Sequence, residues 1–214
     1  EEDPVMAEKY DRLAKDLMKV SLTAYSWTAI LGGILLFTFI TLFPGFFKYM
    51  AGIFRPVMHV YALMFLAESG VLYVYYYGWD KMKDDKFLKW IHCSLSVLLN
   101  LIGTVLMYLA NSWATFMQAP GGIDADGRFL GNIWHVIHST LWNPVGVHRI
   151  LGNIVFGGGI VGAYAAYHYL TAKNEEERAH YDWVCYVAMF ICIFGLIPLP
   201  FAGYWLMKEV YAFR

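Results

Sequence analysis

The sequence predicts an all-α integral membrane protein, a bundle of about five transmembrane helices with a short outer interfacial helix. The chain has 214 residues, of which 59% are hydrophobic and only 15% charged, whereas soluble domains usually carry about 25% charged residues. Five apolar runs each reach the roughly 20 residues that a membrane helix needs. None of them alternates with the period of two that is typical of barrel strands, so a helical bundle is the expected class.

The apolar runs set the expected order of elements along the chain. They lie at about 24–47, 54–78, 89–113, 149–171 and 182–206. Pro198 and Pro200 fall inside the fifth run and should kink or end it, because proline removes a helix hydrogen bond. We therefore expect an amphipathic segment over 1–23, a membrane domain over 24–206 and a tail over 207–214.

The longest connection, 114–148, is expected to hold an outer surface helix over about 129–142. Its Phe129, Trp134 and Trp142 are residue types that suit a membrane interface. This connection carries three of the seven histidines, His135, His138 and His148.

Lysine and arginine predict the orientation, since cytoplasmic loops carry an excess of them. With a cytoplasmic N-terminus, the inner side holds Lys9, Arg12, Lys15, Lys19, Lys81, Lys83, Lys86, Lys89, Lys173 and Arg178. The outer side then holds Lys48, Arg55, Arg128, Arg149, Lys208 and Arg214. The larger inner set predicts a multi-pass protein with its N-terminus in the cytoplasm and the 114–148 connection outside.

Glu68 lies well inside the second run, where a carboxylate costs about 2.5 kcal/mol or more to insert. It is either a proton-path or cofactor-site group, or a neutral glutamate that hydrogen-bonds a neighbouring helix. Asn100, Asn111 and Asn153 suit the same polar track, although asparagine also joins helices to one another.

Histidines at matching depth on different helices suit axial ligation of haem iron. His59 and His148 match at the outer face, and His138 or His135 could replace either. His92 and His168 match at the inner face, but His148 and His168 stand about 30 Å apart along one helix, which argues against two stacked haems. The alternative for each is an interfacial side chain that contacts lipid headgroups. The glycines in GNIVFGGGIVG, 152–162, suit either close helix packing or a packed porphyrin.

Templates of soluble catalysis are absent from the sequence. It contains no phosphate-binding glycine loop, no HExxH and no GxSxG, so no catalytic residue is assigned. The net charge of −1 gives no reason to expect a nucleic-acid partner.

Four stretches resemble subunit I of the cytochrome bd quinol oxidases. They are RLAKDLMKVSLTAYSWTAILGG (12–33), ALMFLAESGVLYVYYYGWDKM (62–82), LNLIGTVLMYLANSWATFMQAPGG (99–122) and WNPVGVHRILGNIVFGGGIVGAYAAY (142–167). The resemblance covers roughly 12–170 and is specific in FLAES…GWDK and LANSW…MQ.P. It implies a bacterial inner-membrane protein of the respiratory chain.

The resemblance also implies roles for single residues. Glu68 and Asn111 fall on family positions that belong to a proton track, while a further family glutamate is replaced by Val60. The family's haem-ligating histidine in the NPV word is replaced by Gly152, and His148 lies one helical turn before it. The family's first span, its later ligands and its quinol-binding loop have no counterpart, so the chain is expected to be a truncated or split relative.

Two functions follow as expectations. The first is a membrane subunit that passes electrons between quinol or quinone and a partner redox subunit through haem b, with an outward-facing cytochrome c-type protein among the expected partners. Such a subunit is not expected to reduce oxygen alone. The second is a haem-free structural anchor that assembles partner chains. A transporter is disfavoured, because inverted repeats are absent and Glu68 is the one carboxylate expected to be buried in the membrane.

Overall fold

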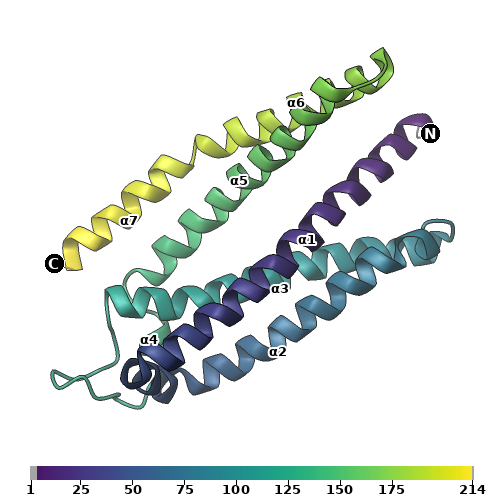
Figure 1. Ribbon diagram of the computed structural model, residues 1–214. Coiled ribbons are helices and arrows are strands. Elements are labelled where there is room, and N and C mark those ends of the chain that lie inside the picture. Colours follow the sequence, from purple (N-terminus) through teal and green to yellow (C-terminus); the bar gives the residue numbers. More distant parts are fainter. Residues whose placement is uncertain (1–3, 214) are drawn as a thin grey trace. The chain divides into compact units, whose positions relative to one another are not determined.

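The computed structural model describes residues 4–213, and helices account for most of them (Figure 1). In chain order the helices are α1 (Pro4–Leu42), α2 (Pro44–Met82), α3 (Lys86–Gln118), α4 (Ile133–Ile137), α5 (Trp142–Thr171), α6 (Glu175–Leu196) and α7 (Leu199–Phe213). Within residues 4–213, five helical segments are long and apolar enough to cross a membrane, with α6 and α7 counted together as the fifth. The predicted all-α class and number of spans are confirmed.

The chain divides into two compact units, Glu1–Leu109 and Ala110–Arg214. The boundary falls within α3, so the first unit holds α1, α2 and most of α3. The second unit holds the end of α3 and the helices α4 to α7.

In the first unit α1 and α2 pack against each other as an antiparallel pair. Phe43 separates them with a non-helical backbone, and Pro44 occupies the first position of α2. Proline fits there because the first amide of a helix has no helical partner, and it biases the preceding residue away from helix. The predicted first run, 24–47, crosses this break, so its end is corrected to Leu42.

Polar contacts tie α1 to α2 near the other end of the pair. Lys15 Nζ lies 2.7 Å from Asp80 Oδ1, and the indole Nε1 of Trp79 donates to Asp11 Oδ1 at 3.0 Å. Trp79 is only 5% exposed, so its indole anchors the contact. The helix α1 therefore runs unbroken from its charged first turns into its apolar part.

The second unit is organised around α5, which packs along α6 and α7 (Figure 1). The helix α6 is capped by Asn174, whose Oδ1 accepts a hydrogen bond from the Glu177 amide at 2.8 Å. It ends at Leu196, and α7 starts at Leu199. The expected interruption of the fifth run at Pro198 is confirmed.

Glycine allows α5 and α6 to approach closely. A Cβ on Gly158 would lie 3.0 Å from the Ala188 carbonyl oxygen and 3.1 Å from Cys192 Cβ. A Cβ on Gly195 of α6 would lie 2.9 Å from Val155. Of the two interpretations of the glycine-rich stretch, these contacts favour helix packing at Gly158. Among the described residues, nothing lies within 4 Å of the positions that a Cβ would take at Gly152, Gly157 and Gly159.

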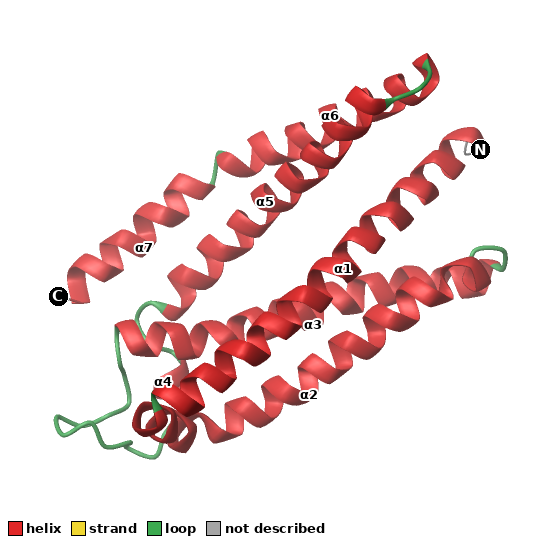
Figure 2. Cartoon of the chain, viewed as in Figure 1, coloured by secondary structure: helices red, strands yellow, loops and turns green. Residues whose placement is uncertain are grey.

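The connection between α3 and α4 is the long loop in Figure 2. Ile123 and Phe129 form an isolated antiparallel bridge, and Asp124 Oδ1 accepts hydrogen bonds from the Asp126 and Arg128 amides at 3.0 and 2.7 Å. The expected surface helix over 129–142 is corrected to the five residues of α4. Gly131, with φ of 85°, lies outside helical conformation, and Trp142 belongs to α5.

Candidate functional site

A group of buried polar residues lies at the end of α3 in the second unit. Asn111, Ser112 and Thr115 are completely buried, and Thr115 Oγ1 donates to the Asn111 carbonyl oxygen at 2.8 Å. The guanidinium of Arg149 on α5 donates to Asn111 Oδ1. The amide Nδ2 of Asn111 is buried and has no partner among the described residues. Since nearly all buried polar groups are hydrogen-bonded, this donor has capacity for water or a ligand.

His148 precedes Arg149 on α5, and its ring faces α7. A Cβ on Gly203 would lie 3.5 Å from His148 Cε1 and 3.7 Å from its Nδ1, so a side chain larger than that of alanine at 203 would press on the imidazole. The Nδ1 atom is buried without a hydrogen-bond partner in the described part of the chain. Packing therefore holds the His148 ring in place, while its Nδ1 makes no hydrogen bond with the described residues.

His138 directly follows α4 in the second unit, and its ring is oriented by two tryptophans. Its Nδ1 lies 3.0 Å from the Trp134 carbonyl oxygen. The ring centroids of Trp134 and Trp142 are 5.1 and 4.3 Å from that of His138. A histidine whose Nδ1 donates to a carbonyl presents Nε2 as a ligand atom, an arrangement common among metal ligands. His138 and His135 are both exposed.

In the first unit Glu68 lies against a glycine of α3. A Cβ on Gly103 would come within 3.0 Å of Glu68 Oε1, so the absence of a side chain there makes room for the carboxylate. Glu68 is half-buried. Next to it, Ser69 Oγ and the hydroxyl of Tyr25 on α1 lie 2.6 Å apart, and the Tyr25 ring stacks on Phe65 at 5.7 Å. The carboxylate thus faces the interior of this unit.

The structure does not bring the predicted ligands together in one unit. His59 lies exposed on α2 in the first unit, whereas His148, His138 and His135 belong to the second. Glu68 and Asn111 are divided in the same way. The His59–His148 pair and the Glu68–Asn111 track therefore stay predictions.

The two histidines predicted at the inner face, His92 and His168, are occupied by protein contacts. His92 Nε2 lies 2.9 Å from the Tyr75 carbonyl oxygen, and its ring stacks on that of Tyr75 at 4.2 Å. His168 stacks on Tyr181 at 4.7 Å. Within residues 4–213, no three His, Cys, Asp or Glu side chains group closely enough to hold a metal ion directly.

Comparison with known families decides the relationship. The sequence model of the family described as cytochrome bd terminal oxidase subunit I matches residues 5–213. The chain belongs to this family. A search of curated proteins finds no match. As a member of the cytochrome bd subunit I family, the protein is a membrane subunit of the respiratory oxidase class, a class that works with haem and quinol and in a complex with other subunits.

The family match is wider than the resemblance of the four stretches indicates. That resemblance ends near residue 170, whereas the match continues through α6 and α7. Both helices therefore fall within the region that the family model matches. Gly203 of α7, which lies against His148, falls within it too.

Two residues of the site do not stand out in the sequence. Arg149 counts there only as an outer positive charge, and nothing in the sequence points to Asn111, 38 positions away, as its partner. Gly203 is one more residue of an apolar run. The one available signal is that Arg149 directly follows a candidate ligand in VHRILGN.

Proposed function

We propose that this subunit passes electrons between quinol or quinone and a partner redox subunit through a haem b, held in the second unit by His148. The observation that supports this is the His148 Nδ1, which is buried and has no hydrogen-bond partner in the described residues. A buried polar atom left unpaired costs about 1–3 kcal/mol, so an imidazole without any protein partner suits a role as a ligand. Bound haem would supply reversible one-electron transfer.

The residues near His148 fit such a group. Gly203 places no side chain against the imidazole of His148, and Cβ positions at Gly152 and Gly159 on α5 would meet no other described residue within 4 Å. Arg149 directly follows His148 on α5 and carries a positive charge. The sequence pairs His148 with His59 of the first unit, and that pairing stays a prediction; within the second unit we propose His138, and then His135, as the second axial ligand. His138 is favoured among these two because its Nδ1 is already bonded, which leaves Nε2 for iron.

Protons are proposed to reach the electron-transfer site past Glu68 and Asn111. Glu68 is half-buried beside Gly103, and Asn111 is completely buried with an Nδ2 that no described residue pairs. A carboxylate that can take up and release a proton, and an amide that can orient water, are the group types such a path needs. Asn100 is a weaker member, because its Nδ2 already donates to the Ser96 carbonyl oxygen at 2.9 Å.

The topology proposed with this function places the N-terminus in the cytoplasm of a bacterial inner membrane. The loop from α3 to α5 then faces outward with His135 and His138, where a cytochrome c-type partner would meet it. Exposed Trp134 and Leu130 in the same loop suit the lipid interface.

The test is a reduced-minus-oxidised spectrum and pyridine haemochrome analysis of the purified subunit, repeated on alanine variants at His148, His59, His138 and His135. We expect a b-type signal that is lost in His148→Ala and weakened in the variant of the second ligand. His180→Ala serves as the control, since it lies at the far end of α5 and α6. A wild-type protein without b-type haem would refute the ligand assignment.

A haem-free anchor is the second candidate, and the engaged histidines favour it. His92, His138 and His168 all contact protein carbonyls or aromatic rings, as purely structural histidines do. If His148→Ala reduces the yield of the assembled complex while the spectra stay unchanged, the anchor function is correct and the electron-transfer function is wrong.

A further inference from the structure

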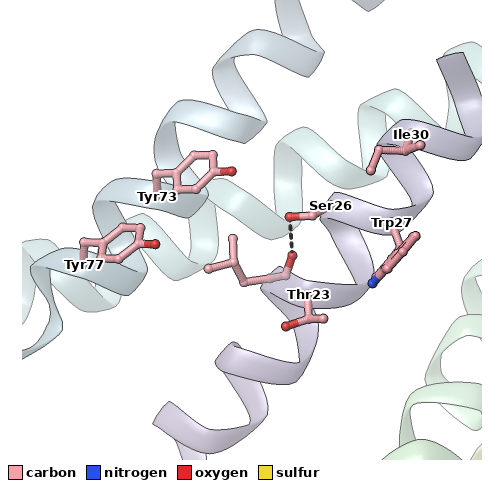
Figure 3. Close-up of a pocket in the computed structure, with 7 residues that line it drawn as sticks. Thr23, Ser26, Trp27, Ile30, Tyr73 and Tyr77 are labelled. Atoms are coloured by element: carbon pink, nitrogen blue, oxygen red, sulfur yellow. Dashed lines mark hydrogen bonds between the residues drawn. The ribbon is translucent and has the colours of Figure 1, made fainter.

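A groove of about 290 Å³ lies on the first unit between α1 and α2, and no histidine is among the residues that line it. Tyr73 and Tyr77 project from α2 towards the α1 face that carries Ser26 (Figure 3). The other labelled wall residues are Thr23, Trp27 and Ile30. The groove follows α1 from Leu22 to Ile30, which is about 12 Å of helix. This volume is at the lower limit of small-molecule pockets and suits a narrow chain.

The two aliphatic hydroxyl groups in the wall, those of Thr23 and Ser26, are already hydrogen-bonded within α1. Thr23 Oγ1 donates to the Lys19 carbonyl oxygen and Ser26 Oγ to that of Leu22, each at 2.9 Å. Their protons are therefore not offered to a ligand, and the deep part of the groove presents carbon and ring surfaces. A polar head that needs donors, such as a quinone ring, gains little there, whereas a hydrocarbon chain loses nothing.

Three polar hydrogens at the rim of the groove have no partner among the described residues. They belong to the indole of Trp27 and the hydroxyls of Tyr73 and Tyr77, whose side chains are well exposed. The Tyr73 and Tyr77 rings are nearly parallel, with an interplanar angle of 7° and centroids 6.0 Å apart. Aromatic donors at the end of apolar spans are typical of the level of lipid ester and phosphate groups.

Two lysines lie one helical turn beyond one end of the groove. Lys19 lies one turn before Thr23 on α1, and Lys81 lies one turn after Tyr77 on α2, so both fall on the groove's side of their helices. Neither makes an ion pair with the described residues, whereas the nearby Lys15 is bonded to Asp80. The opposite end, at Ile30, is apolar. A ligand that fits a groove with lysines at one end and apolar side chains at the other has an anionic headgroup and a hydrocarbon tail.

We propose that this groove binds one acyl chain of an anionic phospholipid, with the phosphate held by Lys19 and Lys81 and the ester region by Trp27 and Tyr77. The site does not involve haem. A failed test of lipid binding would therefore leave the proposed electron-transfer function unaffected, and the reverse also holds.

Native mass spectrometry of the full chain, reconstituted in nanodiscs of phosphatidylglycerol and phosphatidylcholine, tests the site. The wild type should retain phosphatidylglycerol in preference to phosphatidylcholine. Each lysine near a membrane surface contributes about fivefold in anionic-lipid affinity, so the Lys19→Gln/Lys81→Gln variant should lose about 25-fold of that preference. Lys48→Gln, at the start of α2, is the matched control and should keep it.

A second pair of variants tests the acyl chain. Ser26→Phe fills the groove and should remove the bound lipid whatever its headgroup. Thr28→Phe adds the same ring to α1 outside the groove and should leave it bound, because Thr28 is exposed and its hydroxyl bonds its own helix in the same way. Retention of wild-type preference after both lysines are replaced would overturn the proposal, as would equal lipid loss in the two phenylalanine variants. Loss of a quinone instead of a phospholipid from Ser26→Phe would also overturn it.

Discussion

Replacing Gly158 by alanine should weaken the packing of α5 on α6, whereas the same change at Gly159 should not. The new Cβ at 158 would lie 3.0 Å from the Ala188 carbonyl oxygen and 3.1 Å from the Cys192 amide nitrogen, which are backbone atoms that cannot rotate away. At 159 the new Cβ would have no other described residue within 4 Å. The two glycines are neighbours in one helix, so they differ in packing and little else.

The magnitude follows from two opposed terms. Overpacking a close contact costs about 1–3 kcal/mol, and alanine in place of glycine stabilises a helix by about 1 kcal/mol. The helix term is common to both variants, so the difference between them isolates the overpacking cost. A difference of about 2 kcal/mol corresponds to a Tm difference of about 4–8 °C for a chain of this size.

The assay is thermal unfolding in detergent, read by loss of the monodisperse peak on size exclusion and by tryptophan fluorescence. We expect Gly159→Ala to melt at or above the wild type and Gly158→Ala below it. Equal melting temperatures for the two variants would show that the backbones of α5 and α6 are not in contact at this point, and the packing argument would fail.

Four further outcomes are expected. Tyr25→Phe, which keeps the stacking on Phe65 and removes the bond to Ser69, should destabilise the protein by about 0.6 kcal/mol in the same assay, and a loss as large as that of Gly158→Ala would contradict this. Trp79→Phe should cost about 1 kcal/mol or more, because Asp11 loses its indole donor while the buried volume shrinks; an unchanged Tm would count against the contact. Lys15→Ala should leave the Tm unchanged, since the Lys15–Asp80 pair is solvent-exposed, and a clear drop would refute the surface assignment. In a background without native cysteines, Lys9→Cys should react with impermeant maleimide only from the cytoplasmic side and Lys208→Cys only from the other, and the reverse pattern would overturn the proposed topology.

The spans can be predicted from the sequence because hydropathy and length act locally. The break at Phe43 is predictable in principle, since the residue before a proline avoids helix, but the apolar run continues through LFPGFF (42–47) without a charged interruption. Composition alone therefore merges the end of α1 with the start of α2. Pro198 is easier to recognise as a break, because it falls within a run instead of at its edge.

The predicted surface helix is too long for a different reason. Its aromatic pattern is real, but Gly131 has a positive φ and Asn132 caps α4 by accepting from the Trp134 amide at 3.0 Å. An asparagine cap determines where a helix begins, and in a stretch this short it decides the start of α4 more than the spacing of the aromatic residues does. The Arg149–Asn111 contact is beyond prediction from the sequence, because its partners come from different helices and only folding brings them together.

The length of α1 and α2 has a consequence for the surroundings of the protein. Each has 39 residues, or about 58 Å of helix, while the hydrocarbon core of a bilayer is about 30 Å thick. Even with an ordinary tilt, more than about 20 Å of each helix must stand in headgroups or water. The contacts Trp79–Asp11 and Lys15–Asp80 join the protruding ends. A large part of the α1–α2 pair therefore lies outside the hydrocarbon core, where Trp79 and Asp11 hold the two helices together and headgroups or water surround them.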